Sequence, residues 1–143
     1  MVARKEAEVL RVGRVRLRVP RAAEVLEARD LDEVFSQGPA RADALVLLRS
    51  GGVVIAAVVE DTGRPEPRDL ERLDGTVDNL RRMGLIGPGA VILKVLHHRG
   101  LGPGSALLVS LARSRRVELQ ECRSGGTDLA SILRRRGLLP RPS

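Results

Sequence analysis

The sequence predicts an α/β protein with a mixed central β-sheet flanked by helices, and three patterns predict this fold class. Apolar residues alternate with arginine over residues 14–19, which is the period of a half-buried strand. Residues 53–59 form a continuous apolar run, which is typical of a central strand covered on both faces. Apolar residues recur at three- and four-residue steps within residues 68–83, which indicates an amphipathic helix.

The chain of 143 residues fits one domain, so we expect a single domain over 1–143. Its core is expected at about residues 7–122, followed by a basic C-terminal helix within 128–137. The predicted order is β, α, β, β, α, β, α, β, α, which indicates a mixed sheet with helices on its faces. The strands are placed at residues 7–19, 43–49, 53–60, 90–96 and 117–122, and the helices at 31–37, 68–83, 105–113 and 129–136.

The first third of the chain contains one predicted strand and one short helix. Pro20 ends the strand because proline has no amide hydrogen to donate to a sheet. Residues 22–28 form a short apolar segment to which no element is assigned. Asp30 suits the N-cap of the helix at 31–37, and a Gly-Pro pair at 38–39 breaks that helix.

Turn residues separate the later elements. Ser50-Gly51-Gly52 forms a tight turn, so the strands on either side of it are expected to pair as an antiparallel hairpin. Gly84 ends the long amphipathic helix, and Gly137 ends the last helix, which Thr127 or Asp128 caps.

The chain is strongly basic, with a formal net charge of +7 and a sequence pI of about 11.2. Arginine pairs with phosphate through two parallel hydrogen bonds, so a nucleic acid is one expected partner. Surface ion pairs in a thermophile, or a codon bias, explain the same composition. Phe35 is the single aromatic residue, which favours duplex or structured nucleic acid over base stacking on a single strand. The arginines expected to contact nucleic acid are Arg14, Arg16, Arg18, Arg134, Arg135 and Arg136.

Three features predict a cytoplasmic protein that does not enter a membrane. The apolar runs are far shorter than the roughly 20 residues that cross a bilayer. The first eleven residues include several charged ones and lack a continuous apolar segment, unlike a signal peptide. Cys122 is the single cysteine, so no intrachain disulfide can form, and we expect this residue to be a buried small apolar side chain.

Asp43 and Glu60 form the first candidate site. Asp43 opens one strand of the predicted hairpin and Glu60 closes the other, so the two carboxylates are expected to be neighbours. Two close carboxylates suit a hard cation such as Mg²⁺. A cation held there would lower the pKa of a bound water and stabilise charge on a phosphate.

The arrangement of these residues resembles that of the PD-(D/E)XK nucleases, which include archaeal Holliday-junction resolvases and many restriction endonucleases. In that superfamily a helix with glutamate precedes a strand that opens with aspartate. An apolar strand ending in Glu-x-Lys, an amphipathic helix and another strand follow. The matching positions are Glu33, Asp43 and Glu60, and the resemblance covers about residues 31–98. It implies a restriction-endonuclease-like fold, a metal-dependent endonuclease and a homodimer.

The sequence departs from this pattern at Thr62, where the family has its lysine. Threonine cannot supply the positive charge that the family uses to orient the attacking water. One explanation is that Lys94, in the next strand, takes over this catalytic role. The other is that the site is inactive or altered, and that the domain is a non-catalytic binding or assembly module of the same fold.

A glycine-rich turn between a strand and a helix supports a further hypothesis, a nucleotide-binding α/β domain that uses Gly100 to Ser105. Amides in such a turn can bind a phosphate, and Glu118 or Glu121 is spaced to contact a ribose. However, the G-x-G-x-G spacing differs from the dinucleotide-binding motif, and the turn lacks the lysine of a P-loop. The other interpretation is a plain connection in which Ser105 caps the helix.

His97 and His98 follow the strand at 90–96. Adjacent strand residues point to opposite faces, so these two side chains are not expected to share one metal. We expect one of them to face the acidic site and the other to meet solvent.

Overall fold

The computed structural model describes residues 7–35, 42–122 and 126–139, and within them it forms two β-sheets and four helices. The strands are β1 (Ala7–Val12), β2 (Val15–Pro20), β3 (Glu24–Asp30), β4 (Ala44–Ser50), β5 (Val53–Asp61), β6 (Val91–His98), β7 (Val117–Glu121) and β8 (Thr127–Asp128). The helices are α2 (Leu31–Val34), α3 (Pro67–Arg82), α4 (Ala106–Ser114) and α5 (Leu129–Arg135). The predicted α/β class with a mixed sheet and flanking helices is therefore confirmed.

The large sheet has the strand order β3-β4-β5-β6-β7. Its first three strands are antiparallel, and β5, β6 and β7 are parallel. The predicted hairpin is present between β4 and β5, where Gly51 and Gly52 adopt positive φ angles of 55° and 83°. These angles suit a tight hairpin turn and favour glycine.

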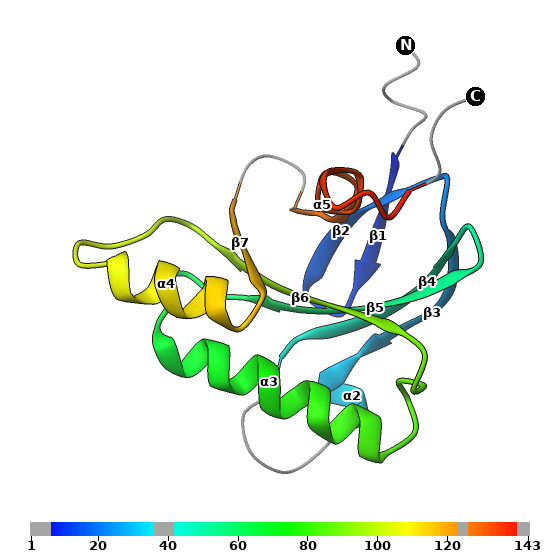
Figure 1. The fold of residues 1–143 in the computed structure, drawn as a ribbon, viewed down its shortest axis with the longest axis horizontal. Helices are drawn as coiled ribbons and strands as arrows, with labels where there is room; N and C mark the ends of the chain where they lie inside the picture. Colours follow the sequence, from blue (N-terminus) through cyan, green and yellow to red (C-terminus); the bar gives the residue numbers. More distant parts are fainter. Residues whose placement is uncertain (1–6, 36–41, 123–125, 140–143) are drawn as a thin grey trace.

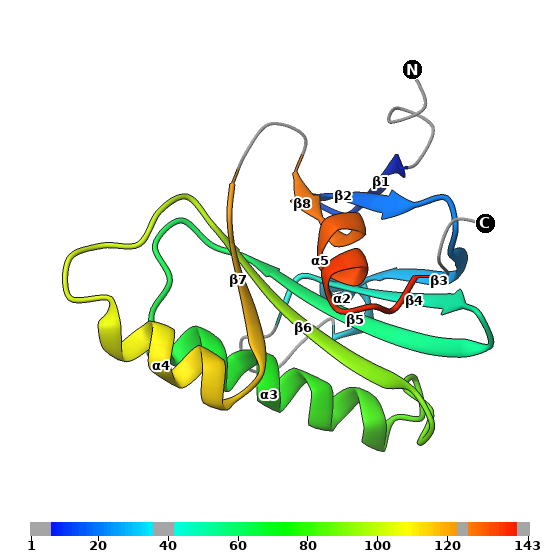
Figure 2. The same ribbon diagram turned by 45° about the horizontal axis from the view of Figure 1, so that its top comes forward.

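Each face of the large sheet is covered by a different layer. The small sheet, with the order β1-β2-β8, and α5 lie on one face, whereas α3 and α4 lie on the other (Figures 1 and 2). Alternate residues of β5 belong to the two cores: Ile55, Ala57 and Val59 to the first, Ala56 and Val58 to the second. The apolar run therefore forms a central strand that is buried on both faces, as predicted.

The predicted strand at 7–19 is wrong in one respect, because it is a hairpin of two strands. The chain turns at Gly13, where φ is 58°, and a Cβ atom there would lie 2.6 Å from Oδ2 of Asp30. The turn shifts the inward-facing positions, so Val12 and Val15 are both buried although their parity differs. The predicted alternation holds only in β2, where Val15, Leu17 and Val19 face the core.

Two strands were not predicted from the sequence. β3 lies at the edge of the large sheet, is mostly exposed and has a register irregularity between Val25 and Glu27, so it lacks a regular hydrophobic period. β8 has two residues and forms only through its parallel pairing with β2. The cap of α2 is confirmed, because the Asp30 side chain accepts a hydrogen bond of 3.0 Å from the Asp32 amide. The helix ends at Val34, with Phe35 at its C-cap, which is three residues before the predicted end; residues 36–41 lie outside the described ranges.

The C-terminal helix α5 is fixed to the rest of the protein at both ends. The Asp128 side chain caps it by accepting a 3.0 Å hydrogen bond from the Ser131 amide. After the helix, the Leu138 carbonyl accepts a 2.8 Å hydrogen bond from the Ser50 hydroxyl. None of the helices in the described ranges is both long and apolar enough to cross a membrane.

Candidate functional site

A hollow of about 340 Å³ lies where β4 begins and β5 ends. Asp43 precedes β4, and its amide donates a 2.9 Å hydrogen bond to the Val59 carbonyl, so the antiparallel pairing places Asp43 beside the end of β5. The residues that line the hollow are Arg14, Asp32, Asp43, Glu60, Asp61, Thr62 and Arg72. The two carboxylates predicted to be neighbours thus line the same hollow.

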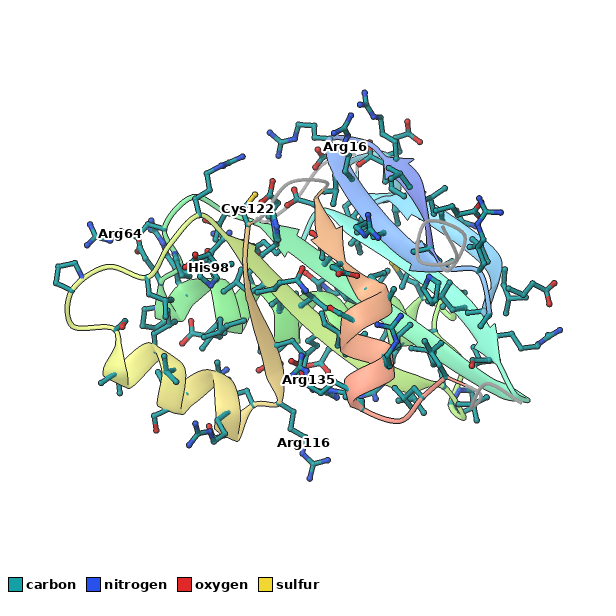
Figure 3. The ribbon with its side chains drawn as sticks, turned by 90° about the horizontal axis from the view of Figure 1, so that it is seen from above. Arg16, Arg64, His98, Arg116, Cys122 and Arg135 are labelled. Atoms are coloured by element: carbon teal, nitrogen blue, oxygen red, sulfur yellow. The ribbon has the colours of Figure 1, made fainter. Side chains whose placement is uncertain are left out.

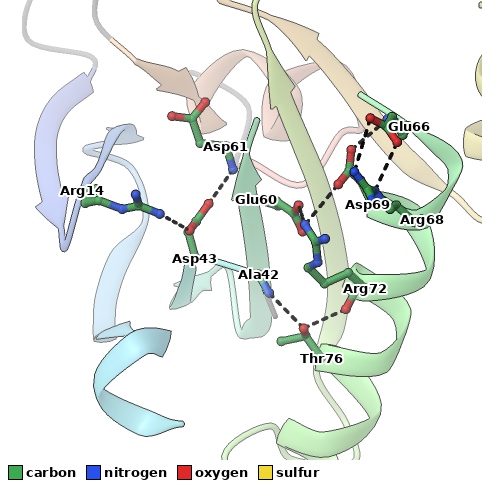
Figure 4. A network of polar contacts seen from close by, with 10 residues as sticks. All are labelled: Arg14, Ala42, Asp43, Glu60, Asp61, Glu66, Arg68, Asp69, Arg72 and Thr76. Carbon is green, nitrogen blue, oxygen red and sulfur yellow. Dashed lines mark hydrogen bonds and ion pairs between the residues drawn. The ribbon is translucent and has the colours of Figure 1, made fainter. Parts of the chain in front are cut away.

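The Asp43 carboxylate is held at the side of the hollow near the small sheet (Figure 4). Its Oδ2 accepts a 2.7 Å hydrogen bond from the Asp61 amide, and its Oδ1 lies 3.3 Å from Nη2 of Arg14. Burial raises the pKa of the Asp43 carboxyl, and these two contacts offset part of that effect. Arg14 reaches the site from the β1–β2 turn.

The Glu60 carboxyl is more deeply buried, with only 3% of the residue exposed. Its Oε2 lies 2.5 Å from Nη1 of Arg72, whereas its Oε1 is buried and has no hydrogen-bond partner within the described part of the chain. Burial raises the pKa of Glu60 to about 8; the charge of Arg72 opposes this shift, and that of Asp69 adds to it. The raised pKa favours the protonated carboxyl at neutral pH, and Oε1 is left unsatisfied in a residue that lines the hollow.

Arg72 is fixed in place by the first turns of α3. Its Nη1 also lies 3.1 Å from Oδ1 of Asp69, which closes the capping box at the start of the helix with Glu66. Its carbonyl accepts a 2.7 Å hydrogen bond from the hydroxyl of Thr76, which in turn accepts one of 3.1 Å from the Ala42 amide. The backbone contacts join α3 to the segment before β4, and Asp69 and Glu60 hold the guanidinium.

Sequence analysis missed Arg72. The signal was present, because Asp69, Arg72 and Thr76 are spaced by three and four residues and therefore form one polar stripe along α3. That stripe borders the apolar face made by Leu70 and Leu73. Polar residues at this border reach the sheet, unlike those on the solvent face.

Two of the predicted catalytic residues lie elsewhere. The Nζ atom of Lys94 is 2.6 Å from Oδ1 of Asp74, and Arg115 lies 3.0 Å from the other oxygen of the same carboxylate. Glu33 is exposed and lines a different hollow, while Asp32 from the same helix lines the hollow of Asp43 and Glu60. Thr62 does line the candidate site, and its amide donates to the His97 carbonyl at 2.9 Å.

The predicted nucleic-acid-binding arginines fall into two groups, one on the small sheet and one at the end of α5 (Figure 3). Arg16 is exposed and Arg18 is partly exposed. Arg135 and Arg136 both pair with Glu118, at 2.8 Å and 2.5 Å. Burial alone would raise the pKa of Glu118, but the hydrogen bonds and charges of these two arginines lower it overall. Arg134, in the last turn of α5, is exposed.

His97 lies as expected, whereas His98 and Cys122 do not. His97 faces Asp61 as one interpretation required, with Nδ1 2.9 Å from Oδ1 of that residue. His98 does not meet solvent, because it is 3% exposed and its Nδ1 accepts a 3.1 Å hydrogen bond from the Gly100 amide. Burial lowers the pKa of His98. Cys122, expected to be buried, is exposed, because it follows the edge strand β7.

The turn at 100–105 offers little to a nucleotide. A Cβ atom on Gly102 would lie 2.0 Å from Nη2 of Arg64, so the Arg64 guanidinium packs directly against the turn. Ser105 occupies the N-cap position of α4 without a capping hydrogen bond from its side chain. Glu118, one of the two acids spaced for a ribose, is paired with Arg135 and Arg136. These contacts favour a structural connection.

Asp43 and Glu60 are the residues of this hollow that could contribute to a cation site. Asp43 and Glu60 supply carboxylate oxygens, and the buried Glu60 Oε1 lacks a partner in the described ranges. Across the same ranges, however, no three His, Cys, Asp or Glu side chains are grouped as a metal site, so water would have to complete the coordination. No family model, curated protein sequence or solved structure matches the chain.

Proposed function

We propose that this chain is a nuclease-like domain that binds Mg²⁺ and duplex or structured nucleic acid, and that it cleaves slowly or not at all at neutral pH. The observation that carries the proposal is the hollow shared by Asp43 and Glu60, in which Glu60 Oε1 has no partner among the described residues. A buried polar atom without a hydrogen bond costs free energy unless a ligand satisfies it.

The order of elements around the hollow supports the same proposal. Asp43 stands before β4, Glu60 ends the apolar strand β5, and then the amphipathic helix α3 and the parallel strand β6 follow. This is the order on which the resemblance to the PD-(D/E)XK nucleases rests. The helix with an acidic residue differs in detail, because Asp32 rather than Glu33 lines the hollow.

Asp43 and Glu60 are the residues that would hold the cation. Such a cation supplies Lewis acidity toward a phosphate oxygen and lowers the pKa of a bound water. Glu60 must lose its proton to act as a ligand, so its raised pKa of about 8 makes cation binding weaker at neutral pH than at pH 8. Arg72 supplies positive charge next to Glu60 and neutralises the carboxylate once it ionises.

A combined binding and cleavage assay tests this proposal. Linear and branched DNA duplexes are incubated with the protein in Mg²⁺, Mn²⁺ or EDTA between pH 7 and 9. We expect a cation-dependent increase in thermal stability and weak cleavage that grows with pH, and both are reduced in Asp43→Asn and Glu60→Gln. If neither Mg²⁺ nor Mn²⁺ changes stability or nucleic-acid binding at pH 8.5, the proposed cation site is wrong.

A second candidate function is a non-catalytic binding module of the same fold. The observation that favours it is that Asp43 and Glu60 already have cationic partners, Arg14 and Arg72. In this case the carboxylates stabilise the fold. The same assay separates the two functions, because this module binds nucleic acid equally well in EDTA and cleaves nothing at any pH.

A further inference from the structure

The outer face of the β1–β2 hairpin has an unusual arrangement of charge. The antiparallel register pairs Arg11 directly with Arg16, and Val9 with Arg18. The inner face of the same hairpin carries Val12, Val15 and Leu17, which are buried in the core. Because successive strand residues point to opposite faces, the paired arginines point away from the core. Arg11 and Arg16 are exposed, and Arg18 is partly exposed. We call Arg11, Arg16 and Arg18 the hairpin arginines.

The hairpin arginines have no carboxylate partner among the residues that the structure describes, unlike several basic residues that pack on the large sheet. Within the described part of the chain, none of the three makes an ion pair or a side-chain hydrogen bond, whereas Arg72, Arg115, Arg135 and Arg136 all pair with carboxylates. Side chains directly opposite each other in an antiparallel pair are close, and like charges there destabilise the sheet. The fold therefore keeps an unfavourable pair, Arg11 and Arg16, without a compensating acid in the described ranges.

The hairpin leads to the candidate site. Arg14, in the turn that follows β1, extends from the same hairpin to Asp43 at the border of the hollow. The Arg14 side chain is 83% exposed, so this ion pair is weak and the guanidinium is free to contact another anion. A chain of phosphates lying on the hairpin would therefore be directed toward Asp43 and Glu60.

We propose that the outer face of the β1–β2 hairpin binds the phosphate backbone of a nucleic-acid duplex and directs it to the hollow. The inference rests on the proposed function for the class of partner. Guanidinium groups spaced along a strand complement a row of phosphates, and an outer face without aromatic residues makes backbone contacts rather than base stacking. The C-terminal helix is the weaker surface, because Arg135 and Arg136 are held by Glu118.

The test compares a hairpin variant with a matched helix variant of the full chain. In the first, Arg11, Arg16 and Arg18 are changed to glutamine; in the second, Arg135 and Arg136 are changed to glutamine. Duplex DNA affinity is measured by fluorescence anisotropy in EDTA between 0.05 and 0.3 M NaCl. We expect the hairpin variant to bind about tenfold more weakly at 0.1 M salt, with the slope of log K against log salt reduced by about 2 to 3.

Thermal unfolding is the control that tests whether the hairpin variant is folded. Its melting temperature should equal or exceed that of the wild type, because the like-charge pair is removed. The proposal is overturned if the hairpin variant keeps the wild-type affinity and slope, if the helix variant loses more affinity than the hairpin variant, or if the wild type binds phosphatidylserine vesicles but no duplex.

The proposed cation site is tested separately, because this binding assay contains EDTA. If hairpin-dependent duplex binding is observed but neither Mg²⁺ nor Mn²⁺ affects the protein, the inference stands and the nuclease-like function fails. If cations act through Asp43 and Glu60 but the hairpin variant binds duplex normally, the inference alone fails.

Discussion

Two ion pairs between the large sheet and α3 have very different environments. Glu60 of β5 pairs with Arg72, and Lys94 of β6 pairs with Asp74, on the same face of the sheet. The side chains of Glu60 and its partner Arg72 are 4% and 26% exposed, whereas those of Lys94 and Asp74 are 18% and 31% exposed, so the difference lies in the Glu60 carboxyl. The Asp74 carboxylate is also paired with Arg115, but one oxygen of Glu60 has no partner among the described residues.

This difference supports the proposal that Glu60, rather than Lys94, belongs to a functional site. The Lys94 pair is satisfied and partly hydrated, so it serves the structure. The Glu60 pair carries a raised pKa of about 8 and an unsatisfied oxygen at a hollow, which are features that natural folds retain mostly at functional sites. The following four predictions test this contrast, from the largest expected effect to the smallest.

Replacing Arg72 by methionine should destabilise the protein most. The change removes the cation beside the buried Asp69 carboxylate and the hydrogen-bond donor to Oε2 of Glu60, so we expect a loss of about 3 kcal/mol in the free energy of unfolding. Urea denaturation at pH 7 measures it. Arg82→Met, at the exposed end of α3, is the control and should change stability by less than about 0.5 kcal/mol. Equal losses in both variants would contradict the special position of Arg72.

Replacing Glu60 by glutamine should change how stability depends on pH. The folded protein holds the Glu60 proton up to a pKa of about 8, whereas an unfolded chain releases it near the ordinary value of 4.5. The folded state thus binds more protons between these values, so this group makes the wild type less stable as pH rises from 4.5 to 8.

In Glu60→Gln this loss is absent, so the variant should become increasingly more stable than the wild type as the pH rises to 8.5 in EDTA. The two proteins should be nearly equal at pH 4.5. Thermal unfolding across this pH range provides the measurement, and Glu71→Gln, on the exposed face of α3, provides the control. Parallel pH profiles for wild type and Glu60→Gln would show that Glu60 ionises normally.

Cation affinity should rise with pH as the Glu60 proton is released. If one proton is displaced, Mn²⁺ affinity increases about tenfold per pH unit up to pH 8 and then levels off. Isothermal titration calorimetry in buffers of different ionisation enthalpy measures both affinity and proton release. In Asp43→Asn the affinity should fall while the pH dependence from Glu60 remains. A pH-independent affinity would place the cation away from Glu60.

Replacing Lys94 by methionine should have the smallest effect. Asp74 keeps its contact with Arg115, so we expect a loss of about 1 kcal/mol or less. Mn²⁺ affinity and any cleavage should be unchanged, because Lys94 does not line the hollow. Loss of cleavage with normal stability would instead support the role of Lys94 as the family's displaced lysine.

Much of the candidate site was predictable because it depends on local sequence. Asp43 and Glu60 flank a hairpin whose turn contains Gly51 and Gly52, and a short turn fixes which residues of the two strands are opposite each other. Glu33 was predicted for the site, but Asp32 lines the hollow instead. Adjacent helical residues differ in direction by about 100°, and only the packing of α2 decides which one lines the hollow.

The sequence by itself determined the fold class, the central position of β5 and the placing of Asp43 and Glu60 around one hollow, because hydrophobic period and turn residues act over short distances. Only the tertiary structure decided that residues 7–20 form a hairpin on a second sheet, that Arg72 is the partner of Glu60, and that Lys94 is held by Asp74. These outcomes depend on which helix packs on which strand and on which of their residues are aligned. A local pattern carries no information about that alignment, because it is set by how side chains distant in sequence fill one core.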